Sequence, residues 1–194
     1  VTGDLDASEF SNPPTNLSVG GPLQNSNEFY ALCESEFHTL ANNLTVGEVN
    51  VGDIFTKANK PLNATIAAGT VVNSTMIHFD PNPTANVAGT ITFPTPILGI
   101  IWSNGQLDAT DGLLGIAGAT YPGGGTARGT FENTDTVTVT SANSLDILFR
   151  AGVPYADSIR VITAPFHCSP VPEPLVACPL GIGLALTFLL RRRR

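Results

Sequence analysis

The clearest structural pattern in the chain is Thr136-Val137-Thr138-Val139-Thr140, in which polar and apolar β-branched residues alternate. Successive side chains of a β-strand point to opposite faces of its sheet, so this alternation predicts a strand with one apolar and one polar face. β-Branched residues also fit the pleated surface of a sheet well. The stretch therefore predicts a half-buried strand.

Similar segments lie on both sides of this strand. They are rich in β-branched or apolar residues and are bounded by Gly, Pro, Asn or Asp, as strands commonly are. Residues 26–40 also fit helical spacing in part, but we favour strands there. Eight or so short strands without a strong helix predict an all-β fold, an antiparallel β-sandwich or jelly roll. The candidate segments are residues 28–33, 37–40, 44–51, 70–79, 90–93, 97–102, 145–149 and 158–163.

The 194 residues are enough for one domain with a real core and short appendages. Residues 1–22, with their Pro and Gly clusters, are expected to form an extended arm. The β-sandwich body is expected over residues 23–165 and a linker over 166–171. Residues 172–194 differ sharply in composition and form a separate tail.

The charge balance limits the partners of the body. Residues 1–171 carry five Lys or Arg against fifteen Asp or Glu, a net charge of about −10. Such a body repels the phosphates of nucleic acid and anionic membrane surfaces. Charged residues make up only 13% of the whole chain, which suits an extracellular β-protein better than a cytosolic enzyme.

The tail has three parts in a fixed order. Pro172, Glu173 and Pro174 form a stiff, extended element, because each proline fixes its own φ and restricts the residue before it. Residues 175–190 carry no charge and as a helix would span about 24 Å. Arg191, Arg192, Arg193 and Arg194 follow, and such a cluster favours the cytoplasmic side of a membrane. We expect a single transmembrane helix here, with the body on the outer side.

This order of motif, apolar span and arginine cluster resembles the PEP-CTERM sorting signal of Gram-negative bacteria. The resemblance covers residues 172–194 and implies processing by an exosortase, a membrane-embedded enzyme that cleaves near the motif. It implies a secreted protein that passes through the inner membrane to the cell surface or extracellular matrix. The function expected from it is a non-enzymatic structural protein of the exopolysaccharide-rich biofilm. A carbohydrate-binding, lectin-like module is the alternative.

Residues 72–164 also resemble a body that recurs among PEP-CTERM proteins. The resemblance rests on residues 72–74, 78–80, 97–101, 107–108, 111–115 and 159–163. That body type carries no assigned activity. The resemblance therefore adds to the expected fold and location and adds nothing to the chemistry.

Catalytic motifs are not found in the sequence. It has neither a Gly-x-Ser-x-Gly elbow nor a His-Glu-x-x-His zinc motif, and the glycine run at 123–125 lacks the pattern of a phosphate-binding loop. His78 and Asp80 are two residues apart, so they would face the same side of a strand as a catalytic or metal pair. The more ordinary interpretation is a polar pair beside a turn. We expect no enzyme.

Binding residues are suggested at three places. Asp108 and Asp111 offer carboxylate ligands for calcium in a Gly- and Asn-flanked segment, although the same residues could simply cap turns or a short helix. Tyr121, beside Pro122, is the candidate for stacking on a sugar. Cys33 and Cys168 could form a disulfide in an oxidising compartment, or remain two free thiols. No other cofactor is expected.

Overall fold

The computed structural model describes residues 13–25, 28–56, 63–122, 128–129, 135–152 and 154–168. Within these ranges the chain forms eleven strands and one helix, and nearly all strand pairs are antiparallel. The expected β-rich body built from antiparallel sheets is confirmed. Residues 1–12 and the tail at 172–194 lie outside the described residues.

The larger sheet has seven strands, and β11 lies near its centre between β5 and β7. Strand β1 forms one edge and β4 the other, while the short β8 pairs in parallel with β11. The stretch at 26–40, for which a strand was favoured from the sequence, contains β1 at residues 30–39. The strands in order are β1 (Tyr30–Thr39), β5 (Val71–Phe79), β11 (Ala156–Thr163), β7 (Ile97–Ile101), β2 (Leu44–Gly47) and β4 (Asn63–Ile66), with β8 (Arg128–Gly129) beside β11.

The smaller sheet has four strands in the order β3 (Ile54–Phe55), β9 (Thr136–Ser141), β10 (Ser144–Ala151) and β6 (Ala85–Thr92). The alternating threonine–valine stretch forms β9. Its Val137 and Val139 are buried while Thr140 is exposed, as the alternation predicts. In β10, buried and exposed residues alternate almost without exception over the whole strand.

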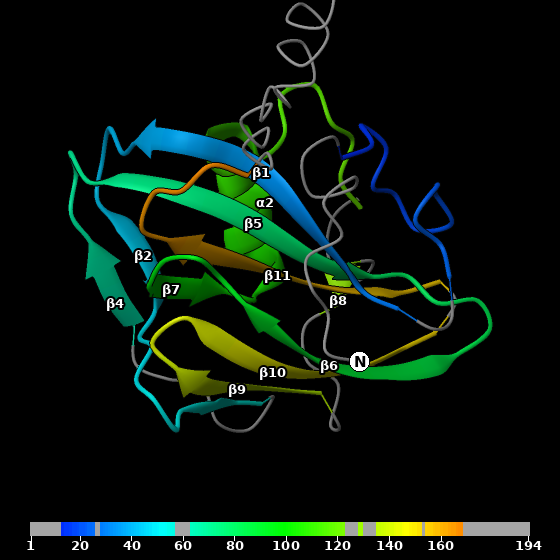
Figure 1. Ribbon diagram of the computed structural model, residues 1–194. Helices are drawn as coiled ribbons and strands as arrows, with labels where there is room; N and C mark the ends of the chain where they lie inside the picture. The colour runs from blue at the N-terminus through cyan, green and yellow to red at the C-terminus, as the bar shows by residue number, and fades with distance from the viewer. Residues whose placement is uncertain are drawn as a thin grey trace, which may run out of the picture.

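The two sheets pack face to face around the main hydrophobic core, and Figure 1 shows them as two layers. The larger sheet contributes Ile77, Phe79 and Val161, and the smaller sheet contributes Ile147 and Phe149. All of these side chains are at most 2% exposed. Burial on this scale supplies most of the favourable free energy of folding.

The other face of the larger sheet is covered by helix α2 (Asn104–Leu114). The expectation of strands without a strong helix missed this element. Gly105 and Gly112 lower the helix propensity of the segment, which hides it from composition. Ser103 nevertheless caps the helix by accepting a hydrogen bond from the Gln106 backbone N–H. The spacing Ser-x-x-Gln is a known helix-start signature that the sequence already contained.

Both expected boundaries of the body shift outward in the structure. Leu17 and Leu23 are 1% and 5% exposed, and Asn16 forms a β-bridge with Thr120, so residues 13–22 pack on the body rather than extend as an arm. Cys168 is also buried, so the body reaches residue 168 and includes the first part of the expected linker. Among the described helices, none has the length and apolar character needed to cross a membrane.

Candidate functional site

A buried polar network lies between the larger sheet and helix α2. Strand β11 creates it because its side chains alternate between the two faces of the sheet. Ile159 and Val161 point into the core between the sheets, whereas Arg160 points toward α2. Arg160 is 0% exposed, so its guanidinium depends entirely on protein partners.

All five N–H groups of Arg160 have acceptors. Its Nε and Nη2 donate to the two carboxylate oxygens of Glu34, at 2.5 and 2.7 Å, and Nη2 also donates to Asp111 Oδ1 at 2.9 Å. Its Nη1 donates to the Leu107 carbonyl at 3.2 Å and to the Thr110 hydroxyl. Burial by itself would lower the pKa of Arg160, but the two carboxylates outweigh it and raise the pKa. Arg160 is therefore a permanent cation that joins β11, β1 and α2.

Glu34 of strand β1 is saturated with hydrogen bonds. Besides the two from Arg160, its carboxylate accepts one from the Ser74 hydroxyl and one from the Tyr121 hydroxyl, each at 2.7 Å. A carboxylate has about four acceptor positions, and here all of them are used. Glu34 therefore has no acceptor position left for a ligand.

Asp111 of α2 connects the two arginines of the network. Its Oδ1 accepts from Nη2 of both Arg160 and Arg128, and its Oδ2 accepts from Arg128 Nη1 at 2.6 Å. Asp108 lies one turn earlier and is 3.3 Å from the same Nη1. Such forked pairs between guanidinium and carboxylate are strong and directional. The two carboxylates proposed as calcium ligands are therefore held by Arg128.

Tyr121 closes the network from the loop that follows α2. Its hydroxyl donates to Glu34 and accepts from the Ile116 N–H at 2.7 Å, and the guanidinium of Arg128 lies 4.6 Å from the ring centroid. Burial and the neighbouring Glu34 raise the pKa of the Tyr121 hydroxyl. Arg128 occupies one face of the Tyr121 ring, and that face is therefore not free to stack on a sugar.

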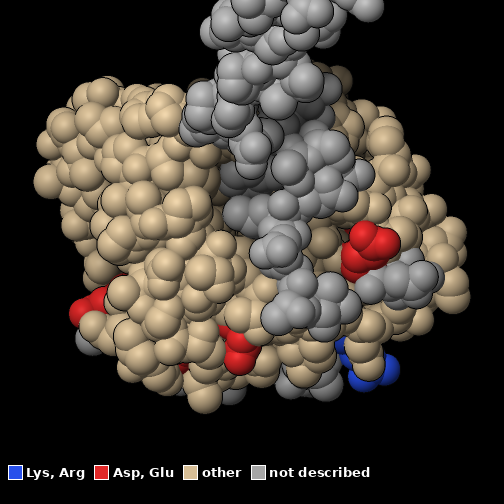
Figure 2. All heavy atoms as spheres, viewed as in Figure 1, with Lys and Arg blue, Asp and Glu red and all other residues tan. Residues whose placement is uncertain are grey.

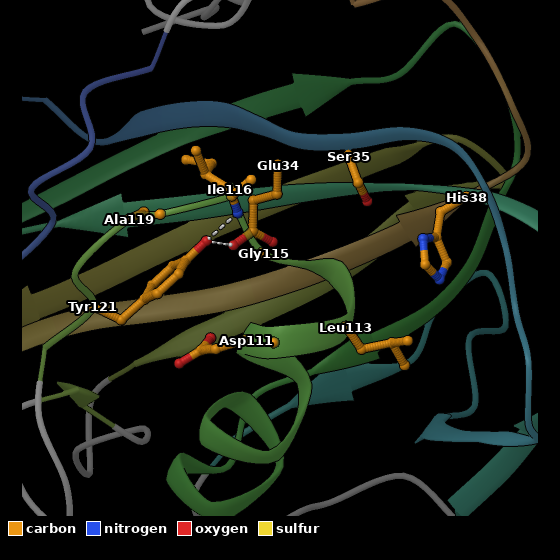
Figure 3. Close-up of a pocket in the computed structure, with 12 residues that line it drawn as sticks. Glu34, Ser35, His38, Asp111, Leu113, Gly115, Ile116, Ala119 and Tyr121 are labelled. Atoms are coloured by element: carbon orange, nitrogen blue, oxygen red, sulfur yellow. Dashed lines mark hydrogen bonds between the residues drawn. The ribbon is translucent and has the colours of Figure 1, made fainter.

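A groove of about 500 Å³ opens beside this network, between strand β1 and the end of α2 (Figure 3). Glu34, Ser35 and His38 line it from β1, and Asp111 and Leu113 line it from the helix. The loop at 115–119, whose residues are small apart from Ile116, completes the lining. Its volume falls within the range of small-molecule sites.

His78 and Asp80 do not form a pair. The His78 ring is buried, and its Nδ1 is 2.9 Å from the Ser158 hydroxyl on β11. Burial, with a contribution from the charge on Arg128, lowers the pKa of His78 to about 4. Asp80 is equally buried and accepts a hydrogen bond from the Gly20 N–H at 2.6 Å. Each side chain secures a different segment of the body.

Cys33 and Cys168 form a disulfide, with their Cα atoms 6.2 Å apart. Together with Glu36 they are the one group of three metal-ligand side chains found among the described residues. Since the two sulfurs are bonded to each other, they are not free thiolates for a metal. His167 lies close by, with Nδ1 3.9 Å from a Glu36 oxygen. The disulfide therefore links strand β1 covalently to the end of the described chain.

Sequence reasoning found Asp108, Asp111 and Tyr121 but missed their partners Glu34, Arg128 and Arg160. A single arginine within an otherwise apolar strand reads as a solvent-facing position until the helix that covers it is known. Ser35 and His38 carried no motif at all. The motif Pro172, Glu173 and Pro174 and the cluster Arg191–Arg194 lie outside the described residues.

Comparison of this chain with models of protein families, with curated proteins and with solved structures yields no match.

Proposed function

We propose that this chain is an exported structural protein of a bacterial cell surface or extracellular matrix, without catalytic activity. The observation that carries the proposal is the three-part tail: Pro172-Glu173-Pro174, the uncharged span at 175–190 and the arginines at 191–194. In this proposal a jelly-roll-like sandwich precedes a single transmembrane helix. The helix holds the chain in the inner membrane until an exosortase-type enzyme cuts near the motif.

The disulfide supports an exported location independently of the tail. Structural disulfides persist in the periplasm and outside the cell, and they are rare in a reducing cytosol. The Cys33–Cys168 bond spans 135 residues, so it closes almost the whole described body. Such a staple suits a protein that must stay folded outside the cell.

The surface charge fits the same proposal. Of the basic residues in the described ranges, Arg128 and Arg160 are buried, while Arg150 is exposed. On the face shown in Figure 2, the described surface is mostly uncharged, with scattered acidic side chains and a basic one at its lower edge. This face shows no broad basic patch for nucleic acid, and it suits contact with neutral matrix polysaccharide.

The proposal is tested by replacing Pro172, Glu173 and Pro174 together with alanine in the full chain. We expect the variant to accumulate uncut in the membrane fraction, since the recognition element is lost while the apolar span remains. Pro170→Ala is the matched control, because it removes a nearby proline outside the motif. Processing of the triple variant at the normal rate would contradict the proposal.

Carbohydrate binding is the second candidate function, and the groove beside β1 is the specific observation that favours it. Exopolysaccharide would be the natural partner of a matrix protein. This candidate function does not include calcium, because Asp108 and Asp111 form ion pairs with Arg128.

A further inference from the structure

The groove is flanked by an irregularity in strand β1 that changes where side chains point. Ser35 and His38 are three residues apart, so a regular strand would place them on opposite faces. The pairing of β1 with β5 shifts register between these two residues, and Phe37 between them has a φ of 48°. That backbone conformation is a real outlier for a bulky residue. It brings both Ser35 and His38 to the wall of the groove.

The strained position is held in place rather than loose. The Phe37 N–H donates to the Asn73 side chain at 2.9 Å, and the Phe37 ring contacts the His167 ring at a centroid distance of 4.8 Å. Bulges commonly re-aim side chains beside functional sites, and backbone strain is retained where the surroundings enforce it. The bulge therefore places two side chains on the groove wall, and contacts with Asn73 and His167 hold its backbone in this conformation.

Two polar atoms in the groove wall are without hydrogen bonds. Ser35 Oγ and His38 Nε2 are both shielded from solvent, and neither has a hydrogen-bond partner among the residues that the structure describes. A serine hydroxyl and an imidazole nitrogen can each form a hydrogen bond, and a change of side-chain rotamer would turn either one toward the groove. Leaving such groups unpaired is unfavourable, so a ligand that bonds to them gains affinity.

The charged groups in the wall point to a neutral ligand. Glu34 and Asp111 are neutralised by Arg160 and Arg128, with Glu34 accepting from four donors. A charged ligand would find no free counter-ion in the described wall and would lose its hydration. Leu113, which is 39% exposed, and Ile116 supply an apolar wall instead. A neutral sugar carries both hydroxyls and C–H groups, so it matches a groove that has both polar and apolar side chains in its wall.

We propose that the groove between β1 and α2 binds a neutral saccharide, with Ser35 and His38 as its hydrogen-bonding residues and Leu113 against its apolar face. This inference rests on the second candidate function and specifies its site and ligand class. It differs from the earlier interpretation of the sequence, because Tyr121 shapes the wall and does not stack on the sugar.

The test is titration of the full chain with maltose, cellobiose and lactose, followed by ligand-observed NMR. Glucose is titrated as well, with glucuronic acid and glucosamine as its charged comparators. We expect at least one neutral disaccharide to bind, and Ser35→Ala and His38→Ala each to weaken that binding about tenfold, as loss of one hydrogen bond does. Leu113→Asp should abolish binding, because it places a charge against the apolar face of the sugar.

Leu148→Ala is the matched control, since Leu148 is 37% exposed on β10 of the other sheet. It should bind as the parent chain does, and all variants should keep the parent melting temperature to within a few degrees. Absence of binding by all three disaccharides overturns the proposal. Binding that Ser35→Ala and His38→Ala leave unchanged would also overturn it. Tighter binding of glucuronic acid or glucosamine than of glucose would do the same. Tail processing is measured separately in cells. A failure of sugar binding can therefore be distinguished from a failure of the export proposal.

Discussion

The two faces of the seven-stranded sheet are both buried, and a network of charged side chains lies on one of them. Toward the smaller sheet, Ile159 and Val161 of β11 lie in the main hydrophobic core. Toward helix α2, Arg160 of the same strand lies in a network with Glu34 and Asp111, beside a second apolar cluster that includes Ile162. We call these regions the apolar layer and the polar layer.

This difference predicts which buried residues can be substituted with little loss of stability and which cannot. Apolar packing is additive over many contacts, so the loss of one methyl group costs little. A buried ionic network is satisfied only as a whole, because removal of one partner leaves another charge buried and unpaired. We therefore expect single substitutions to have unequal effects in the two layers, even at equal burial.

The largest effect is expected from Arg160→Met in the polar layer. The substitution keeps most of the side-chain volume but leaves the Glu34 carboxylate, which is fully buried, without its cation. We expect the free energy of unfolding to fall by about 3–5 kcal/mol. Urea denaturation of both chains measures the difference.

A double variant sharpens this test. Adding Glu34→Gln to Arg160→Met removes the unpaired charge and should recover part of the lost stability. If the double variant were less stable than Arg160→Met by a further several kcal/mol, unpaired charge would not be the cause of the loss.

The next effect concerns β1, which contributes Cys33 to the apolar layer and the adjacent Glu34 to the polar layer. Replacing Cys33 and Cys168 together with alanine removes a crosslink across 135 residues. We expect a loss of about 2–4 kcal/mol, mainly because the unfolded chain becomes less restricted. Urea denaturation with and without reductant provides the measurement, and reductant should no longer affect the variant.

Cys178→Ala is the control for the disulfide prediction. It removes a cysteine from the tail and keeps Cys33 and Cys168 intact. If this control lost the response to reductant, the bond would involve a different cysteine.

A smaller effect is expected from pH, through His78 beside the polar layer. Its pKa is about 4 in the folded chain and about 6.5 when unfolded, so the unfolded state binds more protons between these values. Stability is therefore complete above pH 6.5 and falls as the pH drops toward 4. We expect the contribution of His78 to fall by about 2 kcal/mol between pH 6.5 and 4.5.

His78→Asn isolates this contribution, because its side-chain amide can replace the hydrogen bond between Nδ1 and Ser158. Asp80 lies nearby and has a pKa raised chiefly by burial, so it acts in the opposite direction and is common to both chains. The measurement is the difference between the two stability curves over this pH range. Parallel curves would show that His78 is not held neutral by the fold.

The smallest effect is expected in the apolar layer. Ile147→Val removes one methylene from a side chain that is 2% exposed and should cost about 0.5–1.5 kcal/mol. Thermal and urea denaturation of this variant provide the reference for Arg160→Met. A loss as large as that of Arg160→Met would remove the contrast between the layers.

The apolar layer was predictable because period-two patterns report one buried face. Residues 136–140 and 145–149 were predicted as strands, and they lie in β9 and β10 of the smaller sheet. The short strands β3, β4 and β8 were not predicted, since two to four residues are too few to show a period. Helix α2 was missed because its two glycines masked a capping signature.

The polar layer was not predictable, because it depends on which elements meet. Arg160, Glu34 and Arg128 are separated by up to 126 residues in the chain, and a pairing of that kind leaves no local pattern. Asp108, Asp111 and Tyr121 were proposed from the sequence as calcium and sugar ligands, and in the structure all three contact Arg128. Ser35 and His38 line the same wall of the groove because of a bulge in β1, and the residue types in this segment do not predict a bulge.

The export proposal is tested most directly by the intact mass of the protein recovered from the envelope and medium of the cells that make it, after alkylation without reduction. The account predicts a chain cut near Pro172-Glu173-Pro174, with Cys33 and Cys168 unmodified by the alkylating reagent. An uncut chain that retains Arg191–Arg194, found only in the membrane fraction or with Cys33 alkylated, would contradict it.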